Sequence, residues 1–389
     1  MKSLNTISRI IVGVVFIFSG FVKGIDPFGS TYKFIDYFNA FNLSFLEPLS
    51  FPLAILLSSL EFVIGVAILF SAKKQLTAWV VLLFMLFFTA LTFILAIFNP
   101  VTDCGCFGDA IIMTNWQTFY KNIVIMIFTL IVFVNRNRFL SHWSNLRQWT
   151  LIIIVGLFII SVSGFSYKHL PLIDFRPYSV GTYIPDKMII PEGAPVAEYK
   201  TTLIYGKDDK TIEVTIDNLP DSTWHWIETK HTLVKEGYQP PIHDFTIQSM
   251  DGNDYTDLIL NDGKFTFVMI AYDLKKTNLK SIERINALAD FCKTSGKYNF
   301  ICLTSSAQGE IESFTNKTKA TYPFFNTDEI TLKTIIRANP GIMLLRRGWI
   351  IKKWNSNDLP SIESLTNDVL NNPKYKPAIN ESGEEEFNV

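Results

Sequence analysis

The sequence is poor in cysteine and in net charge, and both shortages exclude classes of protein. Four cysteines in 389 residues are too few to build a disulfide-dense scaffold. The net charge is −1 and no basic stripe is present, so we expect no binding to nucleic acid. Hydrophobic residues make up 48% of the chain. They are concentrated in residues 1–166, whereas the remainder has the composition of a soluble protein.

The N-terminus lacks a signal-peptide cleavage site. The apolar run over residues 10–22 follows Lys2 and Arg9, as it would in a signal peptide. The next five residues, however, read Lys-Gly-Ile-Asp-Pro and form no small-x-small site. Further apolar segments follow, so we predict that the first one is retained as a helix.

Five segments are apolar and long enough to span a bilayer, which takes about 20 residues. They cover residues 7–23, 51–71, 76–98, 119–135 and 149–165. Buried core helices of a soluble protein are the alternative, but five such segments rarely occur together in a soluble fold. The sequence therefore predicts an α-helical membrane bundle that contacts the lipid bilayer directly.

The distribution of basic residues predicts the orientation of the bundle. Short cytoplasmic loops are enriched in Lys and Arg. Residues 99–118 contain Asp103 and Asp109 and neither Lys nor Arg. The basic residues of the N-terminal tail and of two other loops are Lys2, Arg9, Lys73, Lys74, Arg136, Arg138 and Arg147. We therefore expect a bacterial cytoplasmic (inner) membrane protein with a cytoplasmic N-terminus. Everything after residue 168 would be periplasmic, on the same side as Cys104 and Cys106.

Residues 24–50, between the first two spans, are amphipathic and rich in Phe and Tyr. Such a segment suits the membrane interface, where aromatic rings lie at the level of the headgroups. It could equally be a cap packed on the bundle, and the two readings are compatible.

Glu61 is a candidate functional residue because it lies near the middle of the second span. A carboxylate at that depth costs a few kcal/mol, so it should face the bundle interior and have a partner. Lys23 is the nearest plausible cation, unless it extends outward to the interface. Glu61 either handles protons or orients a ligand, or it is a structural hydrogen-bonding group, and the sequence leaves both open.

The most distinctive motif is Cys104-Gly105-Cys106 in the loop between the third and fourth spans. Glycine tolerates the dihedral angles of a small disulfide ring, and ring strain makes a disulfide easier to reduce. Three readings compete: a redox-active pair, an inert structural disulfide or one joined to another cysteine, and a metal site. Two cysteines without His or further Cys nearby form an incomplete metal-ligand set, so we predict no metal.

Residues 1–135 resemble the DoxX/MauE group of four-helix membrane proteins. The resemblance depends on Arg9 and the Phe-Ser-Gly-Phe-Val-Lys run at 18–23, on Glu61 with Gly65, and on the Cys-Gly-Cys-Phe-Gly run at 104–108. The MauE-like branch is associated with maturation of disulfide-containing periplasmic proteins. Its outline also resembles quinone-linked thiol oxidoreductases, so a quinone is a candidate cofactor. A fifth helix, within residues 136–166, and the C-terminal half lie outside the basic family.

The C-terminal half divides into a connector with a small β-rich segment (167–238), an α/β domain (239–371) and an acidic tail (372–389) that we predict to be disordered. In the α/β domain, strands are predicted at 264–272 and 298–304, helices at 277–293 and 307–315, and a hairpin turn at Arg347-Gly348. This order resembles a thioredoxin-like domain of the TlpA/peroxiredoxin type. The residues that carry the resemblance are the Pro-Pro-Ile-His-Asp-Phe run at 240–245, Tyr322-Pro323-Phe324, Asn339-Pro340-Gly341 and Arg347-Gly348.

The resemblance implies a cis peptide bond before Pro340 and a pair of active-site cysteines just after the first strand. Residues 272–278, however, contain no cysteine, so the domain cannot carry out thiol–disulfide exchange there. Cys292 and Cys302 fall on a helix and a strand, where a free cysteine is typically a small core hydrophobe. The domain is left with a candidate partner-binding surface at Pro340, Asp273, Lys275 and Lys276.

Two functions remain open, one enzymatic and one not. In the first, Cys104 and Cys106 exchange disulfides with a periplasmic client protein and pass electrons onward, while the thioredoxin-like domain recruits the client. In the second, the chain is a non-enzymatic, membrane-anchored subunit of a cell-envelope protein complex. The missing active-site cysteines favour the second function, and the Cys-Gly-Cys loop favours the first.

Overall fold

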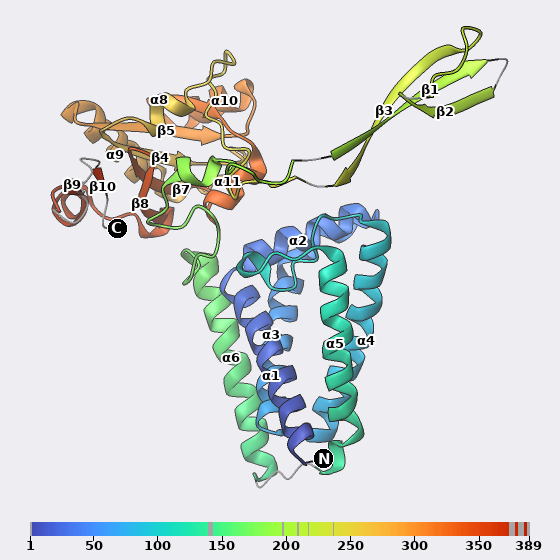
Figure 1. Ribbon diagram of the computed structural model, residues 1–389. Coiled ribbons are helices and arrows are strands. Elements are labelled where there is room, and N and C mark those ends of the chain that lie inside the picture. The colour runs from blue at the N-terminus through green and yellow to red at the C-terminus, as the bar shows by residue number, and fades with distance from the viewer. Residues whose placement is uncertain are drawn as a thin grey trace.

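The computed structural model describes residues 2–138, 143–196, 198–207, 210–216, 218–235, 237–372, 378–379 and 385–386. Over these residues the chain forms three parts (Figure 1). A helical bundle contains the N-terminal half, an α/β domain lies on one end of the bundle, and a small antiparallel sheet projects sideways from that domain.

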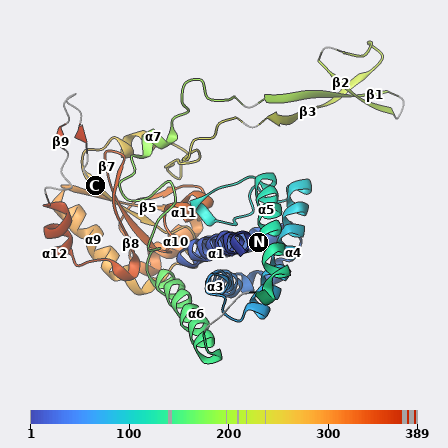
Figure 2. The same cartoon turned by 60° about the horizontal axis from the view of Figure 1, so that its bottom comes forward.

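The five predicted spans are all present as long apolar helices. Their bounds are α1 (Lys2–Ile25), α3 (Ser50–Leu69), α4 (Lys74–Phe98), α5 (Asn115–Val134) and α6 (Asn145–Lys168). In the view along the bundle, α6 lies at its edge beside α3 (Figure 2). The 3₁₀ helices η1 (Ser44–Leu49), η2 (Gly108–Ala110) and η3 (Arg136–Arg138) lie between the spans. The predicted membrane bundle is therefore confirmed.

Helices α1 and α3 pack closely because both present glycine at their contact. A Cβ atom on Gly20 would lie 2.4 Å from the backbone nitrogen of Phe62, and one on Gly65 would lie 2.6 Å from that of Ile17. Small residues at helix contacts let backbones approach within a membrane. The close approach brings the α1 residues Ser19 and Lys23 within hydrogen-bonding reach of Glu61 on α3.

We expect Gly20→Ala to destabilise the bundle by about 1–3 kcal/mol, since the added methyl group forces two helix backbones apart. Gly164→Ala is the matched control, because a Cβ atom there meets nothing within 4 Å. Thermal unfolding of the purified variants in detergent measures the difference. Equal melting temperatures for the two variants would show that the α1–α3 contact is not tight.

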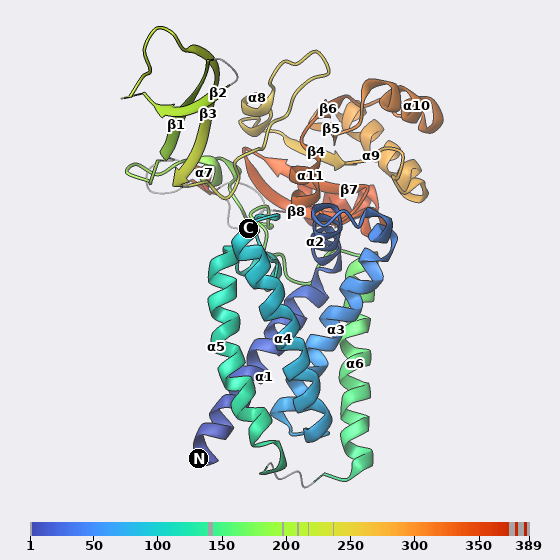
Figure 3. The ribbon, with the colours of Figure 1, turned by 90° about the vertical axis from the view of Figure 1, so that its right-hand side faces the viewer.

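Helix α2 (Pro27–Ala40) covers the end of the bundle, between the spans and the α/β domain (Figure 3). It begins where it does because Asp26 accepts a hydrogen bond from the backbone of Gly29 and Pro27 occupies the first turn. α2 packs against α3 on its bundle side. The aromatic segment predicted from the sequence is thus a cap on the bundle.

The α/β domain contains a five-stranded sheet of order β6-β5-β4-β7-β8. β4 is parallel to β5, β5 is parallel to β6, and β7 is antiparallel to both β4 and β8. The strands are β4 (Phe265–Ile270), β5 (Tyr298–Thr304), β6 (Phe324–Asn326), β7 (Gly341–Arg346) and β8 (Trp349–Asn355). The predicted strands and hairpin are confirmed, and the peptide bond before Pro340 is cis as predicted.

Helices cover both faces of this sheet. They are α8 (Thr256–Leu260), α9 (Ile282–Ser295), α10 (Gln308–Thr318), α11 (Glu329–Ile335) and α12 (Ile362–Leu365), with short turns η4 (Leu279–Ser281), η5 (Ser356–Asp358) and the π-helical η6 (Thr366–Leu370). The helix predicted at 277–293 starts later, at Ile282, because Asn278 accepts a hydrogen bond from the backbone of Lys280 and begins a 3₁₀ turn first.

Strand β4 is buried along its whole length, and its side chains alternate between two cores. Phe267 and Met269 belong to one core together with Cys292 and Cys302. Burial raises the pKa of Cys292 to about 12 and also raises that of Cys302. Both cysteines are therefore buried, protonated core residues, in agreement with the prediction.

The connector after α6 belongs partly to the α/β domain. Tyr178 and Ile184, the first residue of α7 (Ile184–Met188), are buried in the second core of the sheet. The β-rich segment forms a separate antiparallel sheet of order β2-β1-β3. Its strands are β1 (Glu198–Lys207), β2 (Lys210–Thr215) and β3 (His225–Lys235).

The predicted disorder of residues 372–389 concerns a segment that mostly lies outside the described residues. Of its described residues, β9 (Ala378–Ile379) pairs with β10 (Glu385–Glu386) in a two-residue antiparallel ladder. For the rest of the tail the expectation stays a prediction.

Candidate functional site

Cys104 and Cys106 lie in the loop between α4 and α5, with their sulfur atoms 2.8 Å apart. The glycine between them has φ +64°, a left-handed conformation that brings both side chains to one side of the turn. A Cβ atom on Gly105 would also lie 2.9 Å from Cγ of Lys33 on α2. Glycine is therefore required here both for its dihedral angle and for its size.

The loop is fixed to the bundle through the backbone of both cysteines. The Tyr37 hydroxyl donates to the carbonyl oxygen of Cys104 at 2.8 Å, and the Ser19 hydroxyl donates to that of Cys106 at 2.7 Å. Lys33 forms an ion pair with Asp103 at 2.7 Å. Because α1 and α2 supply these contacts, the positions of the two thiols depend on the packing of the bundle.

Glu61 has the partner that its depth in the membrane required. Nζ of Lys23 lies 2.5 Å from Oε1 of Glu61, and both side chains are less than 10% exposed. Ser19 contacts the other carboxylate oxygen, Oε2, at 2.7 Å. A chain of polar contacts therefore runs from Lys23 through Glu61 and Ser19 to the backbone of Cys106.

The Ser19 hydroxyl carries a single hydrogen, so it can donate to only one of its two neighbouring oxygen atoms at a time. When it donates to the Cys106 carbonyl, its contact with Glu61 becomes a second hydrogen bond only if Glu61 carries the proton. Ser19 therefore links Glu61 to the backbone of the cysteine loop.

A cavity of about 480 Å³ lies inside the bundle and reaches the cysteine loop. Most of its wall is formed by apolar and aromatic side chains from α1 to α5. Its few polar lining groups include Lys23, Glu61, Lys121 and the two cysteines. A cavity of this size and polarity fits an apolar ligand that carries a small polar head.

The two thiols differ in acidity. The hydrogen bond from Cys104 lowers the pKa of Cys106 to about 6, and the ammonium groups of Lys121 and Lys23 act in the same direction. The pKa of Cys104 is raised well above its usual value by that same hydrogen bond and by burial. Cys106 is therefore the thiolate of the pair, and Cys104 is the protonated donor.

We expect alkylation of Cys106 in the reduced protein to follow a titration with a midpoint near pH 6, because the thiolate predominates above its lowered pKa. An ordinary thiol titrates near 8.5. Lys121→Met should move the midpoint upward, since it removes a neighbouring cation. Mass spectrometry after timed labelling at each pH measures the rate at each cysteine. Two thiols that both titrate near 8.5 would contradict this asymmetry.

The four residues predicted to bind a partner lie together at one end of the α/β sheet. The Asn339 side chain donates to the carbonyl of Asp273, which links the Pro340 turn to the loop after β4. Pro340 is buried, whereas Lys275 and Lys276 are 74% and 82% exposed. Only the two lysines thus present long side chains to a partner.

Sequence reasoning missed three residues at the thiol site: Ser19, Tyr37 and Lys121. Lys121 carried a usable signal, because an ionisable residue inside an apolar span is a functional candidate. Its ammonium group lies 4.3 Å from the ring centre of Phe107, next to the thiols. Among the described residues, no group of three or more His, Cys, Asp or Glu side chains is placed to hold a metal ion.

The membrane half matches a known protein family. Residues 1–135 match the model of methylamine utilisation protein MauE, which confirms that part of the resemblance. Residues 199–236 match a domain of unknown function, DUF8463, over the projecting sheet. No curated protein matches the chain.

Several solved structures are similar to the α/β domain. A thiol-disulfide oxidoreductase from Bacteroides fragilis is 11% identical, with 33% of this chain and 95% of that one covered and a TM-score of 0.26. A secreted disulfide oxidoreductase of Mycobacterium tuberculosis is 14% identical, with 31% and 87% covered and a TM-score of 0.24. BsSco, of the Sco family of cytochrome c oxidase assembly proteins, is 12% identical, with 33% and 91% covered and a TM-score of 0.28. The strand order and the cis bond before Pro340 make the domain thioredoxin-like, without cysteines in the loop after β4.

Proposed function

We propose that this protein is a membrane thiol–disulfide redox protein in which Cys104 and Cys106 pass electrons from a periplasmic client to a quinone. The observation that carries the proposal is the position of the pair. Two thiols 2.8 Å apart lie in the wall of a large apolar cavity inside the bundle. Neighbouring cations and one hydrogen bond keep one of these thiols ionised.

The cavity supports a quinone as the electron acceptor. Apolar side chains of α3 and α4, among them Leu57 and Phe88, would hold its isoprenoid tail. Lys23 and Lys121 also line the cavity, and their positive charges act on Cys106, so they lie near the thiols and can donate hydrogen bonds to a carbonyl oxygen. A bound quinone supplies a two-electron, two-proton acceptor.

The reaction balances with the groups present. A client dithiol reduces the Cys104–Cys106 disulfide by exchange, so the client gains a disulfide and the pair becomes two thiols. Oxidation of the pair then forms one S–S bond and releases two electrons and the Cys104 proton. Together with the Cys106 proton, which Glu61 has taken up and now returns, they convert the quinone to quinol. Cys106 acts through its thiolate, and Glu61 accepts and returns a proton at the cavity wall.

We place the N-terminus in the cytoplasm of a bacterium and the α/β domain in the periplasm. The N-terminus and the basic loop at Lys73 and Lys74 lie at the opposite end of the bundle from α2 and the α/β domain (Figures 1 and 3). A concentration of basic residues at one end supports this orientation. Client thiols in an oxidising compartment would then meet the cysteine loop on their own side.

Thiol trapping in native membranes tests the proposal. We expect Cys104 and Cys106 to be oxidised when the quinone pool is oxidised and to accumulate as thiols when that pool is kept reduced. Mass spectrometry distinguishes these cysteines from Cys292 and Cys302, which should stay reduced in both states. If Cys104 and Cys106 have the same redox state under both conditions, the proposal is wrong.

A second candidate function, a non-enzymatic envelope subunit, is favoured by the projecting sheet. Strands β1 and β3 stand away from the α/β domain (Figure 1), and Tyr199 and Trp226 on them are more than half exposed. Lys275 and Lys276 offer a further contact for a partner. Affinity purification with and without residues 198–235 tests it. A partner that is lost on deletion supports a subunit role, and recovery of the chain alone in both cases argues against it.

A further inference from the structure

Arg337 joins the α/β domain to the bundle through two carboxylates. It follows α11 in the chain, and its side chain is 6% exposed. Nε lies 2.9 Å from Oδ2 of Asp26, and an Nη2 hydrogen bond of 2.8 Å reaches Oδ2 of Asp109. Asp26 precedes α2, and Asp109 lies in the cysteine loop. One guanidinium therefore binds two separate segments of the bundle.

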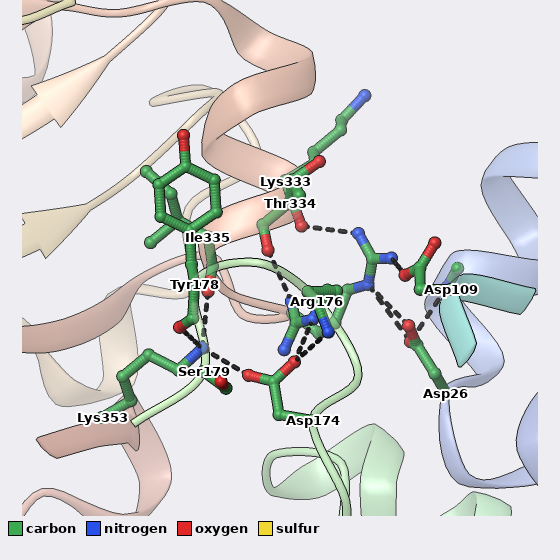
Figure 4. Close-up of polar contacts among 12 residues, drawn as sticks. Asp26, Asp109, Asp174, Arg176, Tyr178, Ser179, Lys333, Thr334, Ile335 and Lys353 are labelled. Atoms are coloured by element: carbon green, nitrogen blue, oxygen red, sulfur yellow. Dashed lines mark hydrogen bonds and ion pairs between the residues drawn. The ribbon is translucent and has the colours of Figure 1, made fainter. Parts of the chain in front are cut away.

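Arg337 is itself held rigidly, because cations bind the carbonyl groups at the C-terminus of α11. Nη1 of Arg337 donates to the carbonyl of Lys333 at 2.6 Å. Arg176 donates to the next carbonyl, that of Thr334, at 3.0 Å, and Lys353 donates to that of Ile335 at 2.8 Å (Figure 4). These contacts satisfy carbonyl groups that a helix end leaves free and complement its dipole.

Asp174 fixes the other two cations of this cluster. Its carboxylate lies 2.7 Å from Nε of Arg176 and 2.5 Å from Nζ of Lys353 (Figure 4). Asp174 belongs to the connector that follows α6. Through Arg176 and Lys353, this connector is bound to the C-terminal end of α11. The α/β domain is thus attached to the bundle at a defined place instead of being tethered loosely.

A compact turn couples the position of Asp109 to that of the thiols. The backbone nitrogen of Gly108 donates to the carbonyl of Gly105 at 3.1 Å, and that of Ala110 donates to the carbonyl of Phe107 at 3.2 Å. Asp109 lies three residues after Cys106 in this turn. A force that holds Asp109 therefore also limits the movement of Cys106.

A second contact supports the same docking. The Lys333 ammonium group lies 4.9 Å from the ring centre of Tyr32 on α2 and 5.5 Å from that of Tyr272, two residues after β4. The Arg337 guanidinium lies 5.3 Å from the Tyr32 ring. The region just before the cysteine-free loop of the α/β domain is thus covered by the protein's own bundle.

We propose that Arg337 is a positioning residue through which the α/β domain holds the Cys104–Cys106 loop closed. The domain then acts on its own bundle: its docking keeps the thiols shielded and aligned with the cavity. This inference rests on the proposed function only in that the loop it holds is the one assigned the thiol chemistry. The surface that carries Lys275 and Lys276 points to solvent and stays open to a client.

The charges favour a docked state over a detached one. Although burial acts to raise the pKa of Asp26, Arg337 and Arg176 lower it below its usual value. Asp26 is thus ionised at neutral pH and pairs with a cation that is always charged. Removing one partner from this buried arrangement leaves a charge without compensation. Undocking the α/β domain would carry the same penalty, so the ion pairs stabilise the docked state.

The test is the alkylation rate of the reduced, full-length protein in lipid nanodiscs, without quinone or client. We expect Arg337→Gln to raise the rate at Cys106, the ionised thiol of the pair, about tenfold. Arg337→Lys should give a smaller rise, since lysine keeps the charge but cannot bridge two carboxylates. Arg284→Gln is the matched control, because Arg284 donates to the Leu359 carbonyl within the α/β domain. It should alkylate like the wild type.

Asp109→Asn keeps the test decisive if Arg337→Gln does not fold, because it leaves the α/β domain unchanged. It should raise the alkylation rate in the same way, and the double variant should show no further rise. Wild-type rates in a folded Arg337→Gln protein, or additive effects of the two substitutions, would overturn the inference. The assay needs no turnover, so a failure here is distinct from a failure of the redox function.

Discussion

Under the proposed function, replacing Cys106 with serine is expected to abolish electron transfer from the protein to a quinone. A serine hydroxyl is not ionised at neutral pH, whereas the hydrogen bond from Cys104 and two nearby cations keep the Cys106 thiol as a thiolate. The variant also cannot form the Cys104–Cys106 disulfide. Cys104→Ser should lose activity equally, because the product of the reaction needs both sulfur atoms. The measurement is the rate of absorbance change of a water-soluble quinone analogue with reduced protein in nanodiscs.

Cys292→Ser is the matched control for this loss. It makes the same chemical change in the core of the α/β domain, at a thiol whose pKa is raised by burial. We expect wild-type turnover for the fraction of this variant that is folded. If Cys292→Ser and Cys106→Ser lose activity to the same extent, the Cys-Gly-Cys loop is not the reactive site.

Glu61→Gln is expected to affect both stability and rate. The substitution leaves the Lys23 ammonium group buried without its carboxylate, and breaking a buried ion pair costs about 3–5 kcal/mol. Loss of a general base costs roughly 10²-fold or more in rate. Thermal unfolding in detergent reports the first effect, and turnover at a temperature where the variant is folded reports the second.

The double variant Glu61→Gln/Lys23→Met separates these two effects. Without the ammonium group no unpaired charge remains, so we expect most of the stability to return. The rate should stay low, because Glu61 can no longer accept a proton and Lys23 can no longer lower the pKa of Cys106. Recovery of both stability and rate would mean that Glu61 has only a structural role, the alternative that the sequence left open.

The bundle was predictable from the sequence because each span is defined locally. A run of about 20 apolar residues needs no tertiary context to be recognised. Glu61 and the Cys104–Cys106 pair were also visible, since a carboxylate in a span and two thiols around a glycine are unusual in themselves. The strands and helices of the α/β domain were readable from periodicity. The absence of active-site cysteines after its first strand could be recognised only through the resemblance to thioredoxin-like proteins.

The remaining features depend on contacts between distant segments. Arg337 is one of several arginines in a soluble domain, and nothing near it in sequence indicates that it meets Asp26 and Asp109. Ser19 and Tyr37 contact the cysteine loop only because α1 and α2 fold against it. The cavity likewise exists only once α1 to α5 are assembled.

The most direct test of the redox function is a stoichiometric titration of the fully reduced protein with a short-chain quinone. Quinol formation is followed by absorbance, and the thiols that remain are counted at each cysteine by mass spectrometry. We predict that each quinol formed corresponds to the loss of both thiols at Cys104 and Cys106, with Cys292 and Cys302 unchanged. Quinone that is not consumed, or thiols lost elsewhere in the chain, would contradict the account.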